Sequence, residues 1–312
     1  MKEQKPQKCR RSIVLMAAAA LMIAALLPFG GILKAHSAVK EEAVKEEEKK
    51  ISVPEGLSCE VKFLLDPEKV LDEDQHLKKE WEQAFGITEE WRPIDVIYLE
   101  TPDRDFQQEG WINRLRWKSG KKKAERTYKK RYPVTDMNIA AACEAAAKDG
   151  FRITGKGTEP DAEKGFKAQI DWGYEEMKLS FNLDSNAALK GHESLASVTG
   201  AEAKDFMKSA MPEEEADWKE SRWGIEMIDR SKIAGPVRFL RARGTLRDME
   251  ITVEIWPVDE KKGSCIVELS FKEKDFQAAS DLRAELTAYF DEQEILLHKD
   301  SLKTKEILDD WL

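Results

Sequence analysis

Three consecutive stretches between residues 94 and 134 have the side-chain patterns of β-strands, and this part of the sequence constrains the fold more than any other. Residues 94–100 are apolar and rich in β-forming side chains, and the turn residues Thr101-Pro102-Asp103 end them. Residues 110–118 and 125–132 follow as the second and third stretches. Since successive side chains of a strand point to opposite faces, this run predicts three successive strands of a sheet.

The second and third of these predicted strands each direct two cations to one face. Arg114 and Arg116 share a face of the second strand, and Lys129 and Arg131 share a face of the third. Like charges side by side on a sheet repel one another. The sequence therefore predicts a counter-anion at this face, supplied either by acidic side chains or by a bound phosphate-like ligand.

The remaining pattern predicts an α+β fold in which helices decorate a closed antiparallel β-barrel of about eight strands. Further strands are expected at residues 58–65, 166–172, 234–243, 246–258 and 264–272, and helices at 67–85, 136–148, 201–209, 213–220, 276–290 and 301–312. Residues 51–312 would form one domain. A helical insertion around residues 134–232 is expected within it.

Residues 1–38 have the pattern of a targeting segment. Basic residues precede an apolar run over 12–33, and the small residues around Ala38 offer a cleavage site. This predicts a secretory signal, and the alternative is an uncleaved anchor, because the run is about as long as a membrane span. In either case the body would be exported, either secreted or anchored to the outer face of the cytoplasmic membrane. Residues 39–50 form a charged linker.

The charge balance limits the partners. The chain has 312 residues, 36% of them charged, and a formal net charge of -9. Residues 1–38 hold six Lys/Arg and one Glu, so the remainder holds 45 basic and 59 acidic residues, a charge of -14. An acidic body argues against general nucleic-acid binding, which requires a basic surface. It leaves room for a small enclosed basic site.

The central run also resembles a known family. Tyr98-Leu99-Glu100-Thr101-Pro102-Asp103, followed by Gly110 and Arg114-Leu115-Arg116, is similar to the signature of the CYTH superfamily, the triphosphate tunnel metalloenzymes. The resemblance covers about residues 58–133 and 233–290. It implies an antiparallel barrel whose interior binds a triphosphate or polyphosphate anion together with a divalent metal.

The presumed inner faces carry a basic set and an acidic set. The candidate phosphate-binding residues are Lys62, Arg114, Arg116, Lys129, Arg131, Arg241 and Arg243, and the candidate metal ligands are Glu60, Glu250, Glu254 and Glu268. Arginine suits phosphate because its planar fork matches pairs of phosphate oxygens. Carboxylates suit Mg²⁺ or Mn²⁺, which prefer oxygen ligands. The resemblance implies that such a metal would polarise the terminal phosphate for attack by water.

Two positions depart from the family pattern. Ser58 stands where the family's first strand, Glu-x-Glu-x-Lys, begins with an acid, and Ser270 replaces the second acid of a closing Glu-x-Glu strand. Fewer carboxylates weaken the binding of hard cations. Three hypotheses therefore stay open. The protein is a metal-dependent triphosphatase or polyphosphatase, a polyanion-binding module at the cell surface without turnover, or a structural domain whose charges pair internally.

Three cysteines lie outside the predicted signal, at Cys59, Cys143 and Cys265. Cys59 and Cys265 begin two predicted barrel strands on their outward faces. If those strands pair, a disulfide between them is an alternative to free thiols in an exported protein. The four histidines have no zinc-like spacing.

Overall fold

The computed structural model describes residues 53–54, 56–153, 165–259, 264–300 and 303–312. The predicted signal over residues 1–38 and the charged linker over 39–50 lie outside the described residues. Within the described part, no helix has the length and apolar character needed to cross a membrane.

The strands follow the alternation of the sequence closely. They are β1 Ser58–Leu65, β2 Arg92–Glu100, β3 Trp111–Lys118, β4 Ala124–Val134, β5 Lys167–Trp172, β6 Met177–Ala187, β7 Lys232–Leu246, β8 Met249–Asp259, β9 Ser264–Glu273 and β10 Leu296–Leu297. The helices are α1 Pro67–Val70, α2 Lys79–Ala84, α3 Asp105–Gln108, α4 Ile139–Lys148, α5 Gly200–Lys208, α6 Glu213–Ala216, α7 Trp223–Arg230, α8 Phe276–Glu292 and α9 Lys303–Trp311.

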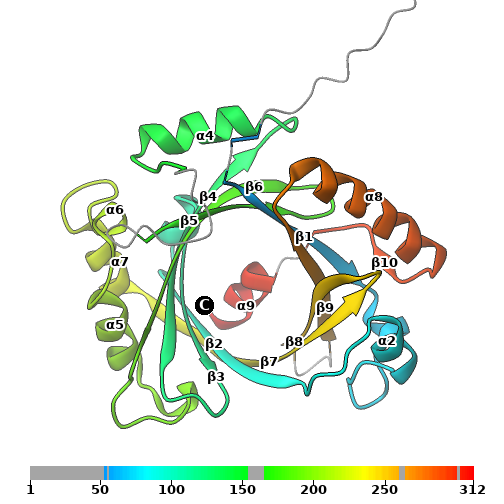
Figure 1. The fold of residues 1–312 in the computed structure, drawn as a ribbon. Helices are drawn as coiled ribbons and strands as arrows, with labels where there is room; N and C mark the ends of the chain where they lie inside the picture. Colours follow the sequence, from blue (N-terminus) through cyan, green and yellow to red (C-terminus); the bar gives the residue numbers. More distant parts are fainter. Residues whose placement is uncertain (1–52, 55, 154–164, 260–263, 301–302) are drawn as a thin grey trace, which may run out of the picture. The chain divides into compact units, whose positions relative to one another are not determined.

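Nine strands close into a barrel in the order β1-β5-β6-β4-β3-β2-β7-β8-β9, with β9 pairing back to β1 (Figure 1). The short strand β10 adds to the end of β1. The helix-decorated barrel predicted from the sequence is confirmed, with nine strands instead of about eight. One neighbouring pair, β1 with β5, is parallel, and the other pairs around the barrel are antiparallel.

The region from 134 to 232 contributes strands as well as helices. β5 and β6 lie within it, and together they fill the arc between β1 and β4. β6 was not expected from the sequence. Its inner face is polar and its outer face carries Leu179 and Phe181, which are buried. The barrel could not close without this pair of strands.

The helix expected over 67–85 is instead two short helices. Asp66 caps α1 by accepting a hydrogen bond from the backbone N–H of Glu68. The chain then turns, because the carboxylate of Asp72 accepts hydrogen bonds from the backbone N–H groups of Asp74 and His76. Leu71 and Leu77 form a β-bridge across this turn. The local Asx-type hydrogen bonding therefore overrides the roughly helical apolar spacing.

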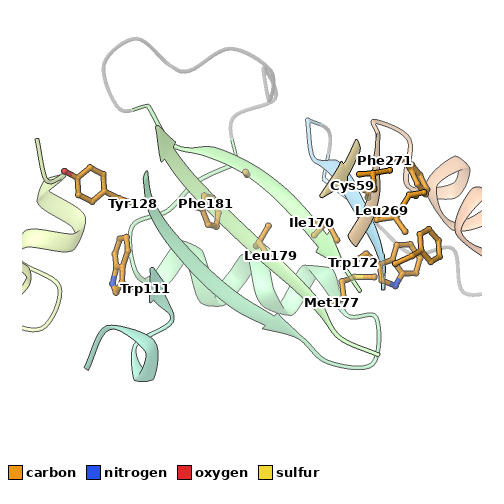
Figure 2. Packing of buried hydrophobic residues seen from close by; sticks show 14 of the residues in the cluster. Cys59, Trp111, Tyr128, Ile170, Trp172, Met177, Leu179, Phe181, Leu269 and Phe271 are labelled. Atoms are coloured by element: carbon orange, nitrogen blue, oxygen red, sulfur yellow. The ribbon is translucent and has the colours of Figure 1, made fainter. Parts of the chain in front are cut away.

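The large apolar core lies on the outer face of the barrel, beneath the helices. Figure 2 shows part of it, with Ile170, Leu179 and Phe181 projecting from β5 and β6. Phe63 of β1 meets Phe290 of α8 edge to face, with ring centroids 5.1 Å apart. Burying such side chains stabilises the fold by roughly 1.5–3 kcal/mol each. The helices thus cover the outside of the barrel and leave its inside for other groups.

One helix departs from this plan, because α9 lies within the ring of strands (Figure 1). Its Ile307 and Leu308 are buried in a second apolar cluster with Tyr98 of β2 and Trp256 of β8. This cluster fills part of the barrel interior. The charged residues of the inner faces lie in the rest of the interior.

The two cysteines considered for a disulfide are free thiols. β1 and β9 do pair, but Cys59 lies opposite Glu273. Cys265 is further along β9 by roughly 26 Å, at a strand's rise of about 3.3 Å per residue. A disulfide needs Cα atoms within about 7 Å. The strand register therefore rules out a Cys59–Cys265 bond.

Glu215 is an acid buried on the outer side of the barrel, with no exposed surface. Asn113 donates a hydrogen bond of 2.6 Å to its Oε1. Glu215 Oε2 and Asn113 Oδ1 are both buried without a partner, so a protonated carboxyl supplies the donor that this pair lacks. Burial raises the pKa of Glu215 to about 8.

We predict that the free energy of unfolding falls as the pH rises, because the buried carboxyl of Glu215 ionises. The folded-state pKa of about 8 exceeds the unfolded value of 4.5. The stabilisation is therefore complete below pH 4.5 and is lost as the pH rises through about 8. Urea unfolding at a series of pH values should show this fall, and Glu215→Gln should flatten it. If the free energy of unfolding of Glu215→Gln depended on pH as it does in the wild type, Glu215 would not be the group responsible.

Candidate functional site

The candidate residues from the sequence all lie on inner strand faces, but they differ in their surroundings. Lys62, Lys129 and Arg131 gather in one cluster, and Arg241, Glu254 and Glu268 in another. Arg114 and Arg116 lie on β3, Glu60 on β1, and Arg243 and Glu250 at the barrel rim.

Asp171 of β5 is the anion that the first cluster shares. Its Oδ2 lies 2.6 Å from Lys129 Nζ and 3.9 Å from Arg131 Nε, and its Oδ1 lies 3.3 Å from Lys62 Nζ. Ser180 donates a further hydrogen bond of 2.6 Å to Oδ2. The counter-anion that the alternation demanded is therefore, at this point, an acidic side chain of the protein itself.

The protonation of this cluster follows from two carboxylates among three cations, because Glu60 Oε2 also lies 3.0 Å from Lys62 Nζ. Burial opposes the ionisation of Asp171, but Lys129, Lys62 and Arg131 hold its pKa well below the ordinary value. Burial lowers the pKa of Lys129 to about 7, even though Asp171 opposes the change. The cluster has a surplus of positive charge, which a further anion would relieve.

The acids of the second cluster are bound to cations from the protein. Glu254 Oε1 accepts hydrogen bonds from Arg241, and its Oε2 accepts one from Trp256 at 2.8 Å. Lys303 Nζ, from α9, lies 2.9 Å from Glu254 Oε2 and 2.8 Å from Glu268 Oε1. Burial raises the pKa of Glu254, but Lys303 and Arg241 outweigh it and hold this pKa well below the ordinary value.

These acids do not fit a divalent metal as they are arranged. Among the described residues there is no group of three His, Cys, Asp or Glu side chains placed to hold a metal ion. Glu60 is bound to Lys62 and Gln169, and Glu250 is exposed at the rim with a relative exposure of 73%. Mg²⁺ and Mn²⁺ require several free oxygens around one point. The candidate ligands instead neutralise basic side chains.

Two arginines differ from the other inner cations. The Nε atoms of Arg114 and Arg131 are buried without a hydrogen-bond partner. Arg116 beside them is paired with Glu125 through a short contact, whereas Arg114 has neither a hydrogen bond nor an ion pair in the described part of the chain. Burial and the neighbouring Arg116 lower the pKa of Arg114. A buried donor without a partner costs free energy, so both guanidinium groups are suited to an external anion.

A cavity of about 450 Å³ lies beside the first cluster, in which Lys62, Lys129 and Arg131 surround Asp171. Its lining includes the cations Lys62, Arg131, Lys178, Lys303 and Lys305 and the acids Glu100, Asp171, Glu176, Glu268 and Asp300. We call it the inner cavity. Its volume lies within the range of small-molecule sites, about 300–1,000 Å³.

Three important residues were not identified from the sequence. Asp171 is an alternating inner position of β5, so its pattern was available, but its strand lies in a poorly legible region. Glu125 begins the same inner face as Thr127 and Lys129. Lys303 had no local signal, because an amphipathic helix ordinarily packs outside a barrel.

No family model and no curated protein matches the sequence. Solved structures are similar in fold. HpAC1 of Hippeastrum, an assigned adenylyl cyclase with a dominant triphosphatase activity, has a TM-score of 0.51 at 10% identity over 82% of this chain and 97% of its own. A Bacillus halodurans protein assigned as an adenylate cyclase has a TM-score of 0.40 at 14% identity over 75% and 90%. The match to HpAC1 shows that the two proteins share a fold, which agrees with the helix-decorated barrel expected from the sequence.

We predict that Asp171→Asn lowers the free energy of unfolding by about 3–5 kcal/mol, because it leaves buried cations without their shared anion. Urea unfolding at pH 7 measures the change. Glu176→Gln is the control, because the Glu176–Lys178 pair is largely exposed and should contribute at most about 1 kcal/mol. Equal effects of the two substitutions would contradict the role of Asp171.

Proposed function

We propose that the barrel binds the phosphate chain of a triphosphate or short polyphosphate, with the inner cavity as the site of one end of the chain. The observation that carries this proposal is that the buried Nε atoms of Arg114 and Arg131 have no hydrogen-bond partner among the described residues, although Arg131 Nε lies 3.9 Å from Asp171 Oδ2. A linear anion with several negatively charged groups would supply acceptors to both. Arg131 would contact it in the inner cavity, and Arg114 further along the interior.

The charge of the cavity supports the same class of ligand. Lys62, Lys129 and Arg131 share the buried carboxylate of Asp171, and Lys62 pairs in addition with Glu60, so three cations face two carboxylates. A phosphate group placed among them would complete their neutralisation and would favour the protonated form of Lys129. The triphosphatase activity of HpAC1, whose fold is similar, is consistent with a triphosphate as the ligand.

The candidate metal ligands favour binding over hydrolysis. In the chemistry that the CYTH resemblance implies, a divalent ion polarises the terminal phosphate. Here Glu254 and Glu268 hold Lys303, and Ser58 and Ser270 stand in place of two acids. We therefore put polyanion binding first and metal-dependent hydrolysis second. Since the N-terminal segment has the pattern of an export signal, we propose that binding takes place outside the cytoplasm.

A structural role is the competing candidate, because Asp171 and Lys303 already neutralise much of the interior. In that case no anion would bind, and replacing the arginines would only change stability. Anion binding and a structural role predict different results when the stability of the protein is measured with and without the anion.

We predict that tripolyphosphate raises the melting temperature of the purified full chain, since a ligand that binds only the folded state stabilises it. A ligand at 100 times its dissociation constant adds about 2.7 kcal/mol to the free energy of unfolding. Sulfate at equal ionic strength is the comparison anion. No shift with tripolyphosphate, or an equal shift with sulfate, would contradict the proposal.

The arginines should decide the affinity. Arg131→Gln and Arg114→Gln should each weaken tripolyphosphate binding about tenfold or more in calorimetric titrations, because a hydrogen bond to a charged group contributes roughly 1.5–3 kcal/mol. Arg230→Gln is the matched control, because Arg230 lies on α7 outside the barrel with its side chain 53% exposed. Variants that fold normally and bind like the wild type would exclude this site. Measured phosphate release with Mg²⁺ or Mn²⁺ would move hydrolysis to first place.

A further inference from the structure

α9 brings a lysine to the place where two candidate metal ligands face each other. Glu254 and Glu268 are directly opposed on β8 and β9, and both are buried. Lys303 Nζ lies between them, 2.9 Å from one carboxylate and 2.8 Å from the other. Two facing buried carboxylates would repel strongly without a cation. The ammonium group supplies this cation from within the chain.

Contacts at both ends of α9 fix the position of this lysine. Before the helix, the carboxylate of Asp300 accepts hydrogen bonds from the backbone N–H groups of residues 174, 175 and 176 at 2.7, 3.1 and 2.9 Å. Near its other end, Asp309 pairs with Arg104 at 3.0 Å. Ile307 and Leu308 are buried in the inner apolar cluster. The helix, which Figure 1 shows within the ring of strands, is therefore held by contacts before its start and near its end.

The carboxylate oxygens have little capacity left for a metal. Both oxygens of Glu254 accept hydrogen bonds, from Arg241, Trp256 and Lys303. Of the two oxygens of Glu268, only Oε2 is without a partner. A divalent ion at this point would have to displace an ammonium group that is already within contact distance of both acids.

Lys303 also faces the inner cavity. An ammonium group has three N–H donors, and the two carboxylates accept two of them. The third donor remains for an oxygen of an anion in the cavity. In this geometry the lysine both neutralises the acids and contacts the ligand, which are two tasks that a bound metal would perform.

We propose that Lys303 is a built-in replacement for the divalent cation, so that the tunnel binds its anion without a metal. The contact with the anion rests on the proposed function, whereas the exclusion of metal does not. The proposal concerns binding only, and no bond is formed or broken in it. It predicts that removing the ammonium group uncovers a metal site.

The test is the binding of Mn²⁺ alone to the full-length protein, measured by calorimetry and by the loss of the free-ion electron paramagnetic resonance signal. The wild type should show no site at this position, whereas Lys303→Ala should gain one Mn²⁺ site at least tenfold tighter than any in the wild type. Adding Glu268→Gln to that variant should abolish the gain. Lys208→Ala is the matched control, because Lys208 also bridges two carboxylates, those of Asp205 and Asp229, but these are exposed.

Wild-type binding of Mn²⁺ as tight as that of Lys303→Ala would overturn the proposal, as would a folded Lys303→Ala variant that gains no site. If that variant does not fold, the wild type decides. Mn²⁺ alone should then leave its melting temperature unchanged, because a metal that binds only the folded state would raise it, and such a rise would overturn the proposal. If the wild type does not bind tripolyphosphate at all, the proposed function fails, while the Mn²⁺ measurement on the variant still decides the role of Lys303.

Discussion

The carboxylate of Asp171 is the interaction on which the interior of this barrel depends. Closing a sheet brings the inner side chains of all its strands together, whatever their charge. Here that convergence places Lys62, Lys129 and Arg131 around one point. Without an anion among them, the free energy of bringing these cations together would oppose closure of the barrel. Asp171 comes from β5, whose parallel pairing with β1 helps to complete the ring.

In the second inner cluster the signs of the charges are reversed, and a cation of the protein neutralises two acids. Glu254 and Glu268 face each other across β8 and β9, and Lys303 neutralises them from a helix that enters the barrel. The two clusters together give the barrel interior an anion and a cation of its own, Asp171 and Lys303. The serines at 58 and 270 fit this arrangement, because fewer acids leave less negative charge for a cation to balance. A single positive charge on Lys303, added to that of Arg241, then matches the two buried acids Glu254 and Glu268.

The strands and their inner faces could be predicted from the sequence because alternation is a local property. The alternation of residues along the strands that carry Arg114 and Arg131 is enough to indicate which side chains share a face. What the sequence could not show is which of these cations stay unpaired, since that depends on residues distant in sequence. Asp171 is 42 residues away from Lys129, and Lys303 is 49 away from Glu254. No local signal states that the last helix lies inside the ring. The helix expected over 67–85 failed for a local reason, because hydrogen bonds to Asp72 close a turn where apolar spacing alone indicated a helix.

A barrel interior whose charges are paired with one another binds an anion differently from an interior whose charges are unpaired until a ligand arrives. When the inner charges are already paired, an incoming anion gains only the difference between its own contacts and the internal ones that it weakens. The internal ion pairs that stabilise the interior without a ligand therefore also limit the affinity for one. Arg114 and Arg131 are the exceptions, because a ligand that reaches them breaks no existing hydrogen bond at their Nε atoms. The selectivity of such a site for a chain of phosphates should therefore depend on contacts with both guanidinium groups, which lie on the neighbouring strands β3 and β4.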